Sequence, residues 1–315
     1  MNPYTDVSFF SFFSVFFRRL FQTFPGGLAA DEVQLFLLIG IALSGALVGT
    51  FLVLRRMTML ANALSHTILF GIVIAFLLLS KSFGPLDIPI LMVSALISGF
   101  LTTFSTQFLS RAVKLQEDAS IGLVFTLFFA LGILLITLFT RNVHIGTELV
   151  MGNTDALQIS DLKLVYAVLL GNAALFTVLF RAFQTTTFDG YFAKCIGFSP
   201  LLFNYLLMVQ TSLTSVTTFR AVGVLMLLAF LTAPVLIARI WTHSLPKLLL
   251  FSCAVGAIAS AFGVALSRHI LTLYGIGLST GGLIVCLLVA MFVFSLIANA
   301  LLVANSKVDF PSPLR

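Results

Sequence analysis

An asparagine and a histidine stand four residues apart in one strongly apolar stretch, as Asn62 and His66. Residues four apart lie on the same face of an α-helix, so both side chains would point the same way, with Ser65 beside them. A neutral imidazole is the commonest protein ligand for transition metals. His66 is therefore a candidate metal ligand. Hydrogen bonding to a neighbouring helix is an equally supported alternative.

The depth of His66 adds weight to a functional role. If its helix begins just after Arg55 and Arg56, the imidazole lies about 15 Å along the axis, at about 1.5 Å per residue. The hydrocarbon core of a bilayer is about 30 Å thick, so this depth is close to the midplane. A polar ring there is costly unless it faces a partner or a wet cavity.

A second candidate element runs from Phe188 to Gly197. Asp189 is a good helix N-cap, Gly197 a good helix stop, and Pro200 can open the next helix. The spacing predicts a two-turn helix outside the membrane, containing Ala193, that suits docking to a partner protein. The alternative is a helix resting on lipid headgroups. In either case it would expose the aromatic side chains of Phe188, Tyr191 and Phe192.

The elements that position these residues must be membrane-spanning. Of 315 residues, 60% are hydrophobic and 9% charged, and the mean hydropathy is +1.14. Soluble domains carry about 25% charged residues, so the composition predicts an all-α, polytopic membrane helix bundle. About nine spans fit, with eight to ten allowed. They are placed near 35–54, 57–80, 87–110, 120–140, 161–183, 201–219, 221–240, 247–267 and 281–304.

Charge sets the expected orientation. The chain carries a net charge of +6, and the larger set of Lys and Arg residues falls on the side of Arg55, which predicts that this side is cytoplasmic. We expect three parts: an interfacial amphipathic segment over 1–30, a permease domain over 31–305 and a cytoplasmic tail over 306–315. No nucleic-acid motif is present, and lipid is the expected surrounding. No GxxxxGK[ST] loop occurs, so any ATP must be hydrolysed by another subunit.

Several blocks of the sequence resemble the permease subunits of bacterial ABC-type manganese, zinc and iron importers. The segment Leu54–His66 is similar to that family's LRRMSLLGDALSH pattern. Further similar blocks follow in the same order over about 35–300, at Glu117–Gly122, Phe129–Leu135, Thr187–Gly197, Ala221–Val224 and Leu231–Pro234.

The resemblance implies a dimeric, type II-like permease in the bacterial cytoplasmic (inner) membrane. It also implies two cytoplasmic ABC ATPase subunits and an extracellular or periplasmic metal-binding protein. The family's Asp-x-x-x-His metal pair maps onto Asn62 and His66, and its ATPase-contacting helix maps onto Phe188–Gly197. The ion would be cargo, with no permanently bound cofactor.

Two departures from the family pattern stand out. The family aspartate is Asn62 here, an oxygen donor without charge, which is consistent with pairing to a second, non-identical permease subunit. The family's Asp-Leu-Pro-x-Gly element is Gly277–Gly281.

Three other functions are alternatives to an importer of free metal ions. A permease for a metal complex such as a siderophore or cobalamin is the alternative. An intramembrane enzyme is remote because neither HExxH nor GxSxG occurs. A purely structural membrane protein is as remote, given the polar pair at the midplane.

Overall fold

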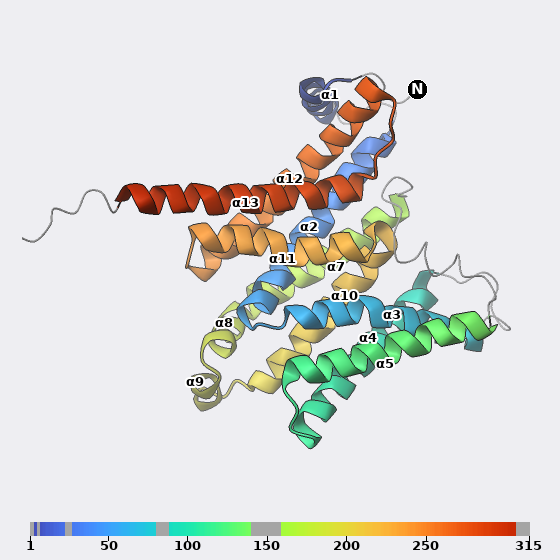
Figure 1. Ribbon diagram of the computed structural model, residues 1–315, viewed down its shortest axis with the longest axis vertical. Helices are drawn as coiled ribbons and strands as arrows, with labels where there is room; N and C mark the ends of the chain where they lie inside the picture. Colours follow the sequence, from blue (N-terminus) through green and yellow to red (C-terminus); the bar gives the residue numbers. More distant parts are fainter. Residues whose placement is uncertain (1–2, 5–6, 23–26, 80–87, 140–158, 307–315) are drawn as a thin grey trace, which may run out of the picture.

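The computed structural model describes residues 3–4, 7–22, 27–79, 88–139 and 159–306, and all regular secondary structure within these ranges is helical (Figure 1). The predicted all-α class is therefore confirmed. The predicted tail, 306–315, lies outside the described residues apart from Ser306. The helices are α1 (Phe9–Phe21), α2 (Ala30–Leu54), α3 (Thr58–Leu79), α4 (Ile88–Ala112), α5 (Glu117–Phe139), α7 (Ile159–Val178), α8 (Phe180–Phe188), α9 (Gly190–Cys195), α10 (Pro200–Val222), α11 (Val224–Trp241), α12 (Leu245–Tyr274) and α13 (Thr280–Ser306).

Each apolar segment predicted to cross the membrane coincides with one helix of this set, except that 161–183 is divided between α7 and α8. Among the described residues, α2, α5, α7, α12 and α13 contain windows long and apolar enough to span a bilayer by length and composition. The chain is thus a multi-pass membrane protein, and the total of about nine spans remains a prediction.

Two helix boundaries differ from the predicted ones. The break expected at Arg220 lies instead at Gly223, where φ is 83°, a backbone conformation that glycine adopts without steric cost. The single segment predicted over 161–183 is divided at Leu179 into α7 and α8. This division turns α8 so that Phe183, which is 0% exposed, packs against Phe176 and its neighbours.

Helix α2 lies at the centre of the bundle. It packs against α12, α11 and α7, while α3, α4 and α5 pack against one another. Helix α10 contacts members of both groups and joins them. In Figure 1 the group of α3, α4 and α5 lies at the lower right, beneath α11 and α13. The helix carrying His66 therefore belongs to the peripheral group.

A buried amide ties three helices together between these groups. Asn172 of α7 donates through Nδ2 to Ser44 Oγ of α2 at 2.6 Å and to Thr214 Oγ1 of α10 at 2.8 Å. Helix–helix hydrogen bonds of this kind contribute about 0.6 kcal/mol each on average in a membrane. The hydroxyl of Thr214 on α10 thus serves helix packing at this level.

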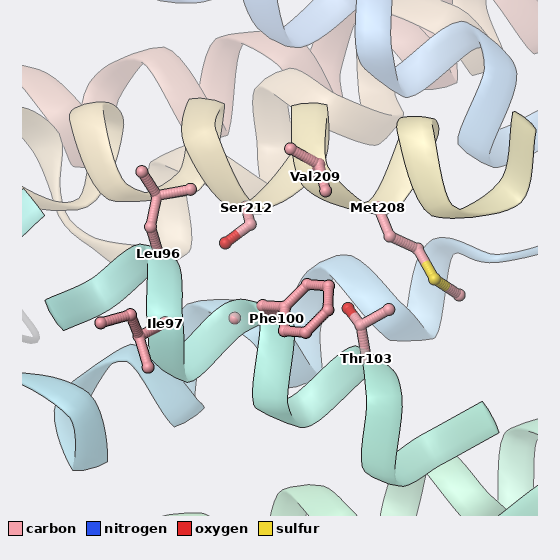
Figure 2. A pocket seen from close by; sticks show the side chains of 8 residues that line it. Leu96, Ile97, Phe100, Thr103, Met208, Val209 and Ser212 are labelled. Carbon is pink, nitrogen blue, oxygen red and sulfur yellow. The ribbon is translucent and has the colours of Figure 1, made fainter. Parts of the chain in front are cut away.

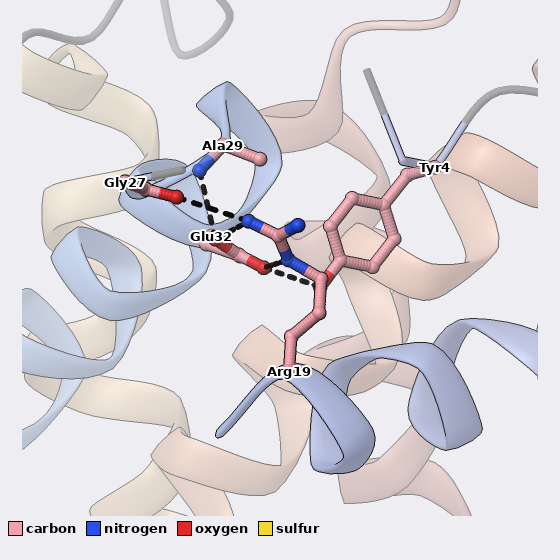
Figure 3. A network of polar contacts seen from close by, with 5 residues as sticks. All are labelled: Tyr4, Arg19, Gly27, Ala29 and Glu32. Atoms are coloured by element: carbon pink, nitrogen blue, oxygen red, sulfur yellow. Dashed lines mark hydrogen bonds and ion pairs between the residues drawn. The ribbon is translucent and has the colours of Figure 1, made fainter. Parts of the chain in front are cut away.

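The N-terminal segment is fastened to α2 by the buried carboxylate of Glu32 (Figure 3). Tyr4 Oη donates to Oε1 at 2.8 Å, Arg19 Nε donates to Oε1 at 2.5 Å, and the backbone N–H of Ala29 donates to Oε2 at 2.7 Å. Burial, together with the hydrogen bond to Glu32, raises the pKa of the Tyr4 phenol, so Tyr4 is a neutral donor. Helix α1 is therefore fixed in place.

A second buried carboxylate supports the same end of α2. Asp31 is fully buried and pairs with Arg268 of α12. Helix α1 lies along α12, where the Phe9 ring is 5.6 Å from that of Phe262. The polar side chains of Ser8, Ser11, Ser14, Arg18 and Gln22 on this segment are exposed, and its interfacial position remains a prediction.

Gly49 sits where α2 and α11 approach most tightly. A Cβ built there would stand 2.0 Å from the backbone oxygen of Leu231 and 2.8 Å from its carbonyl carbon. Because the contacting atoms belong to the Leu231 backbone, no side-chain rotation can relieve the clash, and Gly49→Ala must move the two helices apart. Overpacking of this kind costs about 1–3 kcal/mol, and we expect a lower unfolding temperature in detergent, measured by a thermal shift assay.

Gly171→Ala is the matched control. Gly171 lies on the exposed side of α7, and an added Cβ would meet nothing within 4 Å. Its unfolding temperature should stay at or above that of the wild type, because alanine favours helix. Equal unfolding temperatures for the Gly49→Ala variant and the wild type would contradict the close approach of α2 and α11.

Candidate functional site

The two faces of α3 have different surroundings. Leu60, Ala61 and Leu64 are buried against the rest of the bundle. Asn62 and His66 are half-buried on the other face, in line with Met59, which is 59% exposed. The 3.6-residue helical repeat places these three side chains on one stripe. The pair predicted from the sequence thus lies on a partly exposed face of this chain.

Two aromatic rings of α5 flank the imidazole of His66. The ring centroids of Phe125 and Phe129 each lie 5.3 Å from that of His66, and the two phenylalanines are one helical turn apart. The Nδ1 atom of His66 is buried and has no hydrogen-bond partner in the described part of the chain. Such a nitrogen keeps the capacity to bind a cation, and the electron-rich ring faces favour positive charge nearby.

The residues that the structure describes contain no group of three or more His, Cys, Asp or Glu side chains that could hold a metal ion together. Among the described residues of the α3 stripe, His66 supplies a ring nitrogen and Asn62 a neutral amide oxygen.

An apolar cavity of about 280 Å³ lies between α4 and α10 (Figure 2). Phe100 and Thr103 come from α4, and Met208, Val209 and Ser212 come from α10. Neither Asn62 nor His66 lines it. The cavity and the polar stripe of α3 are thus separate features, and this cavity is not the proposed ion site.

The second predicted element has the expected local structure. Asp189 caps α9, and its Oδ1 accepts from the backbone N–H groups of Tyr191 at 3.0 Å and Phe192 at 2.9 Å. Gly197 follows the helix with φ of 92°, and α10 begins at Pro200.

Burial divides α9 into an inner and an outer side. Ala193 is fully buried, and its carbonyl accepts from the Phe198 N–H at 2.9 Å. Three aromatic side chains point outward, those of Phe188 (63% exposed), Tyr191 (85%) and Phe192 (56%). The element thus presents a rigid aromatic surface at the end of the bundle where α8 meets α10 (Figure 1).

The sequence did not predict the contacts of three residues near these elements. Phe125 and Phe129 flank His66 from a different helix, and Arg55 contacts α8. Arg55 lies within Leu54–His66, the block that resembles the permease family. That resemblance singled out the segment, but it did not indicate which residues Arg55 contacts. Phe129 begins another such block, whereas Phe125 gave no local signal, because phenylalanine is common throughout this chain.

Comparison with known proteins places the sequence among membrane transport components. Residues 33–299 match the model of the ABC 3 transport family. A probable metal transport system membrane protein of Chlamydia muridarum is 43% identical over 298 residues, covering 94% of each chain. The manganese transport system membrane protein MntD of Bacillus subtilis is 36% identical over 236 residues, covering 71% of this chain and 78% of that protein.

A solved structure has a similar arrangement of helices. The structure of PsaBC from Streptococcus pneumoniae in complex with Fab aligns with a TM-score of 0.71 at 28% identity, covering 84% of this chain and 90% of that chain.

Proposed function

This chain belongs to the ABC 3 transport family, and we propose that it is the membrane permease subunit of an ATP-driven importer of divalent transition metal ions. The observation that carries the proposal is the stripe on α3, where His66, with a buried Nδ1 that has no hydrogen-bond partner among the described residues, lies one helical turn from Asn62. The relative named as a manganese transport protein makes Mn²⁺ the first cargo to test.

His66 acts as a transient ligand of the ion in this proposal, and Asn62 supplies a neutral oxygen. Because the stripe is only half-buried within this chain, a second permease subunit covers it and contributes the remaining donors. That subunit is a second copy of this chain or a homologue that retains a carboxylate. The dehydrated path between the two chains would strengthen each ion–dipole contact.

A separate cytoplasmic ATPase supplies the energy. It docks on the aromatic surface of α9, and its ATP-driven movement shifts the helices between outward-open and inward-open states. We place α9 on the cytoplasmic side and α1 at the outer membrane interface, where an extracellular or periplasmic metal-binding protein delivers the ion. The protein resides in the bacterial inner membrane.

Reconstitution tests this function directly. The permease, its ATPase and its delivery protein are placed in proteoliposomes, and Mn²⁺ entry is measured with and without ATP. Entry should require ATP and should be competed by free Zn²⁺ or Fe²⁺. Competition by a siderophore or cobalamin in place of free ions would identify a carrier of metal complexes, and entry without the ATPase would reject the mechanism.

Restoring a carboxylate at position 62 gives a sharper prediction about the stripe. Asn62→Asp adds a negative charge beside the path, and we expect the half-saturating Mn²⁺ concentration for uptake to fall by about tenfold, equivalent to ~1.4 kcal/mol. Asn62→Leu, which removes the oxygen donor, should raise it. An unchanged half-saturating concentration in both variants would exclude Asn62 from the path.

A further inference from the structure

The turn between α2 and α3 holds an arginine that binds two other helices at once. Arg55 Nε donates to Thr187 Oγ1 at 3.0 Å, and Nη2 donates to Thr186 Oγ1 at 2.8 Å. Its Nη1 donates to Oδ1 of Asn204. The two threonines lie in the last turn of α8, directly before the α9 cap, and Asn204 lies near the start of α10. One side chain therefore joins three elements.

This arginine occupies a costly position. Burial lowers the pKa of Arg55 to about 10, so the side chain remains a cation at neutral pH. Its three acceptors are neutral oxygens. Burying a charge costs free energy unless the charge is both paired and hydrogen-bonded. These three acceptors carry no opposite charge, so stability alone would not favour an arginine at this turn. The planar fork of guanidinium donors can, however, bind several acceptors in fixed directions.

Helix α8 packs against the guanidinium of Arg55 and against α2 and α10 through the ring of Phe183. The Cζ atom of Arg55 lies 5.8 Å from the ring centroid of Phe183. That ring is fully buried, 5.3 Å from Phe51 of α2 and 5.1 Å from Phe203 of α10. Close-packed interiors transmit displacement instead of absorbing it. A force on the α8–α9 element would therefore reach Arg55.

The path from Arg55 to the polar stripe is short. Only Arg56 and Met57 separate it from the first residue of α3. The turn is tight, since Met57 N–H donates to the Leu52 carbonyl at 2.9 Å and Arg56 has φ of 60°. Asn62 then follows about one helical turn after the start of α3. Movement of the turn must shift the base of the helix that carries Asn62 and His66.

From these contacts we propose that Arg55 is the positioning residue that couples the α8–α9 element to α3. It passes the movement of the ATPase-docking surface to the ion-binding stripe. This inference rests on the proposed function and adds to it a specific mechanical link. Arg55 itself touches neither the ion nor the ATPase.

The test measures transport and ATP hydrolysis together in the reconstituted complex, with Mn²⁺ as the probe. Arg55→Lys keeps the positive charge but removes the planar guanidinium that binds several acceptors at once. We expect the number of Mn²⁺ ions imported per ATP hydrolysed to fall by about tenfold or more. Loss of one hydrogen bond to a charged group is enough for a change of this size. ATPase binding and hydrolysis should persist. The double substitution Thr186→Val and Thr187→Val keeps Arg55 and should uncouple the complex in the same way.

Arg56→Lys is the matched control, because Arg56 is exposed in the same turn. It should import and hydrolyse as the wild type does. An unchanged ratio of ions to ATP in both the Arg55 and the threonine variants overturns the inference, as does loss of ATPase binding, which would indicate a docking role. A wild-type complex that hydrolyses ATP but imports no metal rejects the proposed function itself, and the inference falls with it.

Discussion

We expect His66→Ala to abolish ATP-dependent Mn²⁺ uptake while the variant still assembles with its ATPase. The imidazole Nδ1 is buried between two aromatic rings and has no protein partner among the described residues. Its removal leaves no nitrogen donor on the stripe, while the buried face of α3 is untouched. Loss of groups around a metal lowers affinity or activity by about 10–100-fold, and a direct ligand should cost no less. Uptake into proteoliposomes is the measurement.

His243→Ala serves as the control for this prediction. His243 is exposed and lies outside the helices, between α11 and α12, so its loss should leave uptake unchanged. Full uptake by the His66→Ala complex would show that the ring serves packing against Phe125 and Phe129. A variant that no longer assembles would point to the same structural role.

The helices and the caps of α9 were predictable because their determinants are local. A long apolar run must be helical in lipid, where every backbone polar group needs an internal partner. Asp189, Gly197 and Pro200 act within a few residues of themselves. The α9 helix could therefore be located from the sequence, together with the aromatic side chains that it exposes.

The surroundings of the site were not predictable because they depend on distant segments. The division at Leu179 follows from the packing of Phe183 against rings on α2, α7 and α10. The neighbours of His66 come from α5, and hydropathy cannot say which helix faces which. Arg55 finds its acceptors more than a hundred positions away, on α8 and α10. From the sequence, a cation at a helix end predicts membrane orientation and not which distant helices it contacts.

Substituting both Tyr191→Ser and Phe192→Ser will detach the ATPase from the permease. These side chains are 85% and 56% exposed, so their loss removes little from the fold. Exposed aromatic residues on a rigid helix are typical anchors of protein interfaces, where truncation costs about 2 kcal/mol or more. We expect the affinity for the ATPase to fall at least tenfold, by the relation of about 1.4 kcal/mol per factor of ten. Binding is measured in detergent by interferometry.

Phe10→Ser provides a comparison at the other end of the bundle. Phe10 of α1 is 83% exposed, and its loss should leave ATPase binding intact, because α1 lies at the opposite end of α2 from the α8–α9 element (Figure 1). If the Tyr191 and Phe192 variant binds the ATPase normally, α9 rests on lipid headgroups instead. The proposed coupling through Arg55 would then fail, because a helix that contacts only lipid cannot pass the movement of the ATPase to Arg55.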